Sequence, residues 1–305
     1  MKNIFIIAII GFYANSYADD FQLADAKSTY QTKLINKESE GFPVEKPPKD
    51  LFDLIEYRSP IGQLPAYISK PESKHKKHPA IIWIIGGFSN GISNYVWSDH
   101  SPQNDQSASI FRKKGIITMY ASLRGGNENP GFNENFYGEV DDIIAAAKHL
   151  ATLEYVDANR IYLGGHSTGG TLALLVAEST SIFRAIFALG ATGNVSDYGQ
   201  ESLNYDISIK QESDYRAPIR WLDSITSPTF LFEGEGGNVY SLFSMQNVNK
   251  NKLVHFYPIF GYNHFSIIQP LSSVIADKIL LDDKQDNHVA FDKDKLLKDI
   301  NKSKM

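Results

Sequence analysis

The sequence contains a five-residue pattern suited to presenting a nucleophilic serine. The residues Gly165-His166-Ser167-Thr168-Gly169 follow a short apolar run and precede a run with helical spacing. In this G-x-S-x-G pattern the serine stands on a sharp turn between a strand and a helix, and the glycines allow the close backbone contacts of that turn. A serine held in this way can attack a carbonyl carbon and carry the acyl group as a covalent intermediate. We therefore predict that Ser167 is a nucleophile.

The same pattern occurs a second time, as Gly87-Phe88-Ser89-Asn90-Gly91. A strand-like run precedes this serine too, but the residues after it have neither helical spacing nor good helix formers. The glycine pair Gly86-Gly87 instead favours a loop whose backbone N–H groups approach an oxygen closely, and the alternative is a tight loop without a catalytic role. We predict that the N–H groups of Phe88 and Thr168 form an oxyanion hole, because such donors stabilise the charge that develops on an attacked carbonyl.

A histidine late in the chain is suited to act as the general base. A serine hydroxyl needs a neutral imidazole to accept its proton. His264 lies between a predicted strand at 253–257 and a predicted helix, where enzymes with this nucleophile turn place their histidine. The other seven histidines lie in early loops, inside predicted helices or strands, in the C-terminal tail, or beside Ser167. We predict that His264 is the base.

The acid that orients this histidine should follow the strand predicted at 229–233. The sequence offers Glu233 and Glu235 there, but no aspartate. Either carboxylate can hold an imidazole and stabilise its charged form. We expect Glu235, because it lies in the loop proper, with Glu233 as the alternative. Asp197 is a third candidate.

Short apolar runs that alternate with helical stretches predict the fold class. Continuous apolar runs are typical of strands buried on both faces of a parallel sheet. Their alternation with helices predicts an α/β fold with a mostly parallel, doubly wound sheet. Turn residues at 59–62 predict an antiparallel hairpin ahead of it. The predicted strands are 80–85, 116–120, 160–164, 185–189, 229–233 and 253–257, and the predicted helices are 105–115, 139–157 and 168–179.

The first residues have the features of a secretory signal. They contain one lysine, an apolar run too short to span a bilayer, and the small residues Ser16 and Ala18 at positions that a signal peptidase accepts. We predict a signal peptide over residues 1–18 with cleavage after Ala18, and therefore a secreted or periplasmic protein. No later segment resembles a membrane span, so we expect no stable span in the mature form.

The rest of the chain divides into three parts. Residues 19–50 are a polar, proline-bearing N-terminal lead-in, and 51–281 are the predicted catalytic domain. Within that domain, 192–225 is a possible lid or crossover insertion whose contact with substrate is left open. Residues 282–305 are a charge-dense C-terminal tail, either a surface helix or a frayed end.

Composition narrows the classes of function. A net charge of -5 without a long basic run argues against nucleic-acid binding. The absence of cysteine removes thiol nucleophiles and thiolate metal sites, and the histidines lack a metal-binding spacing. We therefore expect no cofactor and no metal. The expected partner is a small-molecule ester or a short peptide as substrate, and the sequence leaves the oligomeric state open.

Taken in order, these motifs resemble the catalytic domain of the prolyl oligopeptidase family within the α/β-hydrolases. The resemblance covers roughly residues 54–281. It implies a serine hydrolase that cleaves an ester or amide bond, because stand-alone domains of this kind are often esterases or small peptidases. The segments that carry it are "IIGGFSNG" at 84–91, "YASLRGGNENPGF" at 120–132, "GEVDDIIAAAKHLA" at 138–151, "DANRIYLGGHSTGGTLAL" at 157–174, "RAPIRWLDSITSPTFLFEG" at 216–234 and "GYNHF" at 261–265.

Three departures from the family pattern bear on function. Residues 19–50 leave no room for the propeller that restricts access in large oligopeptidases, so oligopeptide specificity is not implied. Ile85 stands where some members have a tyrosine in the oxyanion hole, which implies a hole made of backbone N–H groups alone. The family's H-G-x-x-D motif reads Glu233-Gly234-Glu235-Gly236-Gly237 here. The missing aspartate motivates an alternative function, a non-catalytic binding protein on a hydrolase scaffold.

Overall fold

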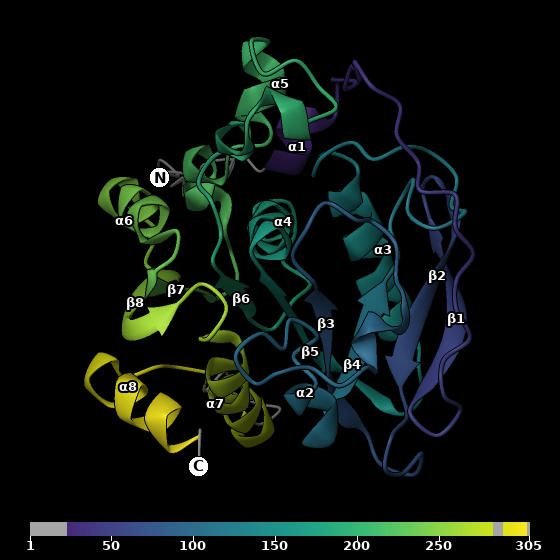
Figure 1. Cartoon of the computed structure of the whole chain (residues 1–305), viewed down its shortest axis with the longest axis vertical. Coiled ribbons are helices and arrows are strands. Elements are labelled where there is room, and N and C mark those ends of the chain that lie inside the picture. Colours follow the sequence, from purple (N-terminus) through teal and green to yellow (C-terminus); the bar gives the residue numbers. More distant parts are fainter. Residues whose placement is uncertain (1–22, 283–288, 304–305) are drawn as a thin grey trace, which may run out of the picture.

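Eight strands form the central sheet, in the order β1-β2-β4-β3-β5-β6-β7-β8 (Figure 1). The structure is a computed structural model that describes residues 23–282 and 289–303, so the predicted signal peptide with its cleavage site lies outside the described residues. The strands are β1 (Phe52–Ser59), β2 (Gly62–Ser69), β3 (His78–Ile84), β4 (Ile117–Ala121), β5 (Val156–His166), β6 (Ile186–Leu189), β7 (Thr229–Gly236) and β8 (Val254–Asn263).

The direction of the strands follows the prediction. All neighbouring pairs from β4 to β8 are parallel, whereas β1 pairs with β2, and β2 with β4, in antiparallel fashion. Ser59 pairs with Gly62 at the end of the hairpin, so its loop consists of Pro60 and Ile61 alone. The central strands are apolar on both faces because helices cover both faces of the sheet. The predicted fold class, a mostly parallel α/β sheet with an N-terminal antiparallel hairpin, is confirmed.

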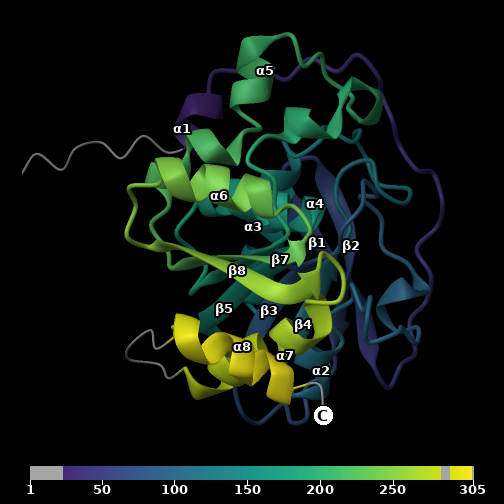
Figure 2. The same cartoon turned by 60° about the vertical axis from the view of Figure 1, so that its left-hand side comes forward.

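Two layers of helices enclose the sheet (Figure 2). Helices α3 (Glu139–Leu150), α4 (Thr168–Ala177) and α6 (Val239–Val248) pack on one face, and their apolar residues join one hydrophobic cluster. On the other face, α2 (Ile110–Lys113), α7 (Ile268–Leu281) and α8 (Lys293–Lys302) contribute to a second cluster. Helix α8 lies in the predicted C-terminal tail and buries Leu296 and Ile300. None of the described helices has both the length and the hydropathy needed to cross a bilayer.

The helix predicted at 105–115 is much shorter than expected, because α2 spans only four residues. The Asp105 carboxylate accepts hydrogen bonds from the hydroxyls of Ser107 and Ser109, and Ala108 has a φ of 47°. Short polar side chains that bond locally in this way compete with the helical hydrogen bonds. The spacing of apolar residues in the sequence does not reveal this competition, so the predicted helix was too long.

The lead-in and the insertion lie against each other at one end of the molecule. The lead-in begins with α1 (Leu23–Lys27), and the insertion at 192–225 forms short 3-10 turns and α5 (Lys210–Asp214). Both views place α1 beside α5 (Figures 1 and 2). The hydroxyls of Tyr30 and Thr32 both donate to the carboxylate of Glu212, at 2.7 Å each. The lead-in is therefore ordered by contacts with a segment far away in the chain.

Candidate active site

Ser167 occupies a strained turn between β5 and α4. Its backbone has φ 57° and ψ −120°, a region that non-glycine residues rarely adopt. The two glycines of the pattern are required by close contacts, since a Cβ on Gly165 would lie 2.4 Å from the Gly169 carbonyl oxygen, and one on Gly169 would lie 2.2 Å from that of Ile84. The Ser167 N–H donates to the Leu189 carbonyl at 2.8 Å. The local geometry is that of the predicted nucleophile turn.

Ser89, the serine of the second pattern, has a different environment. It lies exposed in the loop after β3, and its hydroxyl donates to the Glu40 carboxylate at 2.6 Å. No helix follows it directly; the next element is a 3-10 turn at Asn94–Val96. The context argument that favoured Ser167 over Ser89 therefore agrees with the structure.

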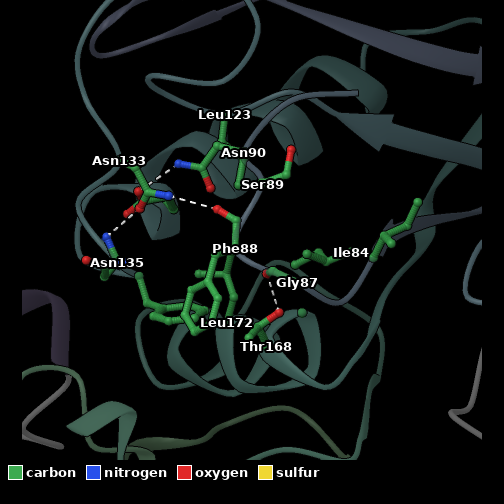
Figure 3. A pocket seen from close by; sticks show the side chains of 14 residues that line it. Ile84, Gly87, Phe88, Ser89, Asn90, Leu123, Asn133, Asn135, Thr168 and Leu172 are labelled. Carbon is green, nitrogen blue, oxygen red and sulfur yellow. Dashed lines mark hydrogen bonds between the residues drawn. The ribbon is translucent and has the colours of Figure 1, made fainter. Parts of the chain in front are cut away.

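The loop with the glycine pair lies beside Ser167. A Cβ on Gly86 would be 3.0 Å from the Ser167 Cβ. The Thr168 hydroxyl donates to the Gly87 carbonyl at 2.5 Å (Figure 3). The Gly87–Phe88 peptide bond is trans, so the Phe88 N–H points to the side opposite this carbonyl. Within the described part of the chain, the N–H groups of Phe88 and Thr168 have no protein acceptor. Neither N–H group is therefore occupied by the described part of the protein, and the Phe88 N–H points away from the Thr168 side chain.

The carbonyl group of Phe88 itself also accepts a hydrogen bond. The Asn133 side-chain amide donates to the Phe88 carbonyl at 2.9 Å (Figure 3). The Phe88 ring packs edge-on against Tyr198 of the insertion, with ring centroids 5.3 Å apart. Figure 3 also places Leu172 beside this ring, in the pocket that the loop and α4 enclose. The insertion therefore reaches the predicted oxyanion loop.

His264 follows the last strand, as predicted. The Asn263 side-chain oxygen accepts hydrogen bonds from the N–H groups of Phe265 and Ser266 and so shapes the turn that carries His264. The imidazole lies directly over Gly190, where a Cβ would be 2.4 Å from Cε1 of the ring. Because Gly190 adjoins Leu189, which binds the Ser167 backbone, both side chains lie at the same edge of the sheet. Within the described residues the Ser167 hydroxyl forms no hydrogen bond, including to this ring.

The acid beside His264 is Glu233, and the expectation of Glu235 is wrong. Nδ1 of His264 lies 2.9 Å from Oε2 of Glu233, whose side chain is 1% exposed. The same carboxylate accepts the N–H groups of Gly234 at 2.7 Å and Asn238 at 2.9 Å. Glu235 is exposed, and among the described residues its carboxylate accepts only the N–H of Gly261, at 3.3 Å.

An irregularity in the pairing of β7 with β8 separates the two glutamates. Strand β7 continues to Gly236, and its pairing with β8 shifts register between Gly234 and Gly236. Glu233 pairs with Pro258 in the regular part of the ladder and is buried, whereas Glu235 lies in the irregular stretch, where two steps along β7 correspond to four along β8, and is exposed. The third candidate, Asp197, accepts a hydrogen bond from the Thr192 hydroxyl, whereas Nδ1 of His264 is hydrogen-bonded to Glu233.

His166 contributes to the site in a way that the sequence did not indicate. Its Nε2–H donates to the carbonyl of His264 at 2.8 Å, and the two ring centroids are 4.4 Å apart. The His166 side chain is fully buried, and this burial together with the neighbouring imidazole lowers its pKa to about 3. A neutral His166 therefore ties the nucleophile turn to the histidine loop. In the sequence, only the position of His166 beside Ser167 indicated a role in the site, and that position suits a packing residue equally well.

The sheet has the α/β-hydrolase fold, and Ser167, His264 and Glu233 lie at one edge of it. Residues 102–236 match the prolyl oligopeptidase family, which confirms over that segment the resemblance seen in the sequence. Protease 2 of Moraxella lacunata is 29% identical over 119 residues, a match that takes in 34% of this chain and 17% of that protein. The match thus spans under a fifth of that relative.

Solved structures agree on the fold. Pyrococcus horikoshii acylaminoacyl peptidase superposes with a TM-score of 0.59 at 15% identity, covering 82% of this chain and 44% of the other. A puromycin hydrolase gives a TM-score of 0.60 at 17% identity, covering 75% of this chain and 39% of the other. The esterase Est22 gives 0.55 at 18% identity and covers 76% of this chain and 79% of its own. Two of these three structures are therefore much longer than the part that matches.

Proposed function

We propose that this chain hydrolyses an ester or amide bond of a small ester or short peptide through an acyl-enzyme. Ser167 attacks the carbonyl carbon, His264 accepts the serine proton and passes it to the leaving group, and Glu233 orients His264 and stabilises its charged form. The N–H groups of Phe88 and Thr168 receive the oxyanion. Water then attacks the acyl-enzyme with His264 again as base, which releases the acid and restores the Ser167 hydroxyl.

One observation carries this proposal. A buried carboxylate contacts Nδ1 of His264, and that imidazole lies over the same strand ends that hold the strained Ser167 turn. Strain of this kind costs about 1–3 kcal/mol and persists at functional sites because the surrounding structure enforces it. The alternative function, a non-catalytic binding protein, was motivated by a missing acid. Glu233 in contact with His264 removes that motive.

A fluorophosphonate probe tests the reaction class, because it reacts only with an activated serine. We expect the wild-type protein to label stoichiometrically and Ser167→Ala to lose all labelling. Ser89→Ala is the matched control, since Ser89 belongs to the other copy of the same pattern, and it should still label to completion. Absence of labelling in folded wild-type protein would refute the enzyme and favour the binding protein.

The bond that is cleaved requires a substrate panel. We expect p-nitrophenyl esters to be cleaved faster than aminoacyl p-nitroanilides, because an alkoxide or phenoxide leaves more readily than an amine. The structural neighbours include an acylaminoacyl peptidase and an esterase, so both substrate classes belong in the panel. Turnover of neither class by a protein that labels with fluorophosphonate would contradict the proposed substrates.

We further propose that the protein is exported, on the basis of residues 1–18. Intact mass spectrometry of the protein recovered from its host should give a mature N-terminus at Asp19. A cell-associated chain that retains Met1 would contradict export.

A further inference from the structure

A segment outside the family match contacts the predicted oxyanion loop. Residues 28–45, called the N-terminal arm below, run from α1 to the hairpin along the outside of the molecule (Figure 1). The arm pairs with the insertion through a bridge between Leu34 and Tyr205. It then continues to the loop after β4, where the N–H of Glu40 donates to the Gly125 carbonyl at 2.8 Å. These backbone contacts place the Glu40 side chain against the loop after β3.

The Glu40 carboxylate accepts four hydrogen bonds. Its Oε1 accepts the Ser89 hydroxyl at 2.6 Å, the Asn90 N–H at 2.9 Å and the Gly91 N–H at 3.3 Å. Its Oε2 accepts the Asn127 N–H at 2.9 Å. Hydrogen bonds to an ionised acceptor are about twice as strong as those between neutral groups. A single arm residue therefore joins three consecutive loop residues to a second loop.

Glu40 completes a set of anchors around the Phe88 peptide groups. Thr168 holds the Gly87 carbonyl and Asn133 holds the Phe88 carbonyl, while Glu40 fixes the residues that follow. The approach is close, because a Cβ on Gly91 would lie only 2.1 Å from a Glu40 oxygen. The loop after β3 has no regular secondary structure between Ile84 and Asn94, so these side-chain contacts, together with the hydrogen bond from the Leu123 N–H to the Asn90 carbonyl at 2.8 Å, hold its conformation.

We propose that Glu40 is a positioning residue for the oxyanion hole, so that the N-terminal arm is part of the catalytic unit. The inference rests on the proposed function, since it assigns the Phe88 N–H to the oxyanion. Oxyanion donors act because they are held in place before charge develops. Without the Glu40 contacts the enzyme would still bind substrate, but the loop would have to reorganise as charge develops in the transition state, and this reorganisation raises the barrier. The expected defect is therefore in kcat and not in KM.

Kinetics of three variants test this inference. The carboxamide of Glu40→Gln keeps one oxygen for the three Oε1 donors but faces the Asn127 N–H with an NH2 group. Glu40→Ala loses all four hydrogen bonds of the carboxylate but keeps the backbone bond to Gly125. We expect kcat on a p-nitrophenyl ester to fall by about tenfold in Glu40→Gln and about 100-fold in Glu40→Ala, with KM within about twofold, because losing a whole donor costs about 10²–10³ in kcat. Glu38→Gln is the control, since Glu38 is on the same arm but its carboxylate, within the part of the chain that the structure describes, accepts only from Asn204.

Two further measurements separate positioning from general destabilisation. Phenylboronic acid forms a tetrahedral adduct with a nucleophilic serine, so its affinity should fall in parallel with kcat in the Glu40 variants and stay unchanged in Glu38→Gln. Hydrogen exchange should rise in peptides that cover the 86–91 loop in Glu40→Ala, with the melting temperature of the Glu40→Gln protein near that of wild type.

The possible results distinguish this inference from the proposed function. A fall in kcat no larger than in Glu38→Gln, a defect confined to KM, or unchanged boronate affinity would overturn the role of Glu40 while Ser167 remains the nucleophile. Because hydrogen exchange needs no turnover, unchanged protection of the 86–91 loop in Glu40→Ala would overturn the inference even in an inactive protein. Failure of wild-type protein to label with fluorophosphonate would instead reject the proposed function.

Discussion

Replacing Glu233 is the most direct test of the site, because the sequence and the structure favour different glutamates. In Glu233→Gln, the amide oxygen can take the place of Oε2 and still accept from His264 and Asn238. The amide nitrogen then faces the Gly234 N–H, which loses its acceptor. The variant therefore keeps the orientation of the histidine but removes the negative charge that stabilises its protonated form.

The size of the effect follows from the burial of the pair. The side chains of Glu233 and His264 are 1% and 16% exposed, so solvent screens the interaction poorly. Removing one partner of a buried ion pair costs about 3–5 kcal/mol. Since about 1.4 kcal/mol corresponds to a factor of ten in rate, we expect kcat to fall by about 10²–10⁴-fold. The unpaired Gly234 N–H should lower the free energy of unfolding by about 1–3 kcal/mol.

The assay is hydrolysis of the best p-nitrophenyl ester by wild-type protein, Glu233→Gln and Glu235→Gln, with circular dichroism to confirm folding. Glu235→Gln is the matched control, because its exposed carboxylate has a single long contact. It should retain kcat within about twofold, as expected for a surface substitution. Equal losses in the two variants, or wild-type turnover by folded Glu233→Gln, would refute the assignment of Glu233.

Substitutions at three other positions test the surrounding structure. Thr168→Val removes the hydroxyl that holds the Gly87 carbonyl, so kcat/KM should fall about tenfold and stability by about 1 kcal/mol, and unchanged ester kinetics would contradict the role of this contact. Ser167→Gly and Ser167→Ala should both be inactive. In urea unfolding the glycine variant should be more stable than the alanine variant by about 1–2 kcal/mol, because φ is 57° at this position. The reverse order of stability would show that the turn is not strained. Glu178 is fully buried, neither of its carboxylate oxygens has a partner among the described residues, and burial raises its pKa well above 4.5. The folded protein therefore retains a proton that the unfolded chain releases as pH rises, so Glu178→Met should stabilise the protein more at about pH 8 than at about pH 5 in guanidinium titrations, whereas equal gains would exclude this titration.

Much of the fold could be predicted because it depends on local patterns. Continuous apolar runs located all six predicted strands of the parallel part, although β5, β7 and β8 extend further than those runs. The nucleophile turn was predicted for the same reason, since Gly165, Ser167 and Gly169 are neighbours in the chain and the steric demand of the turn acts on them directly. His264 followed from its place after the last strand.

The acid, His166 and Glu40 could not be assigned in this way. The choice between Glu233 and Glu235 depends on how β7 pairs with β8, since the register shifts beside Glu235 and no residue pattern within β7 indicates that shift. The Nε2–H of His166 meets a carbonyl 98 positions away in the sequence, and the Glu40 carboxylate meets the N–H of Gly91 51 positions away. Steric and hydrogen-bonding preferences of neighbouring residues determine the turn and the strands. The partners of these three side chains are determined only by the tertiary fold, which brings distant backbone groups within hydrogen-bonding distance.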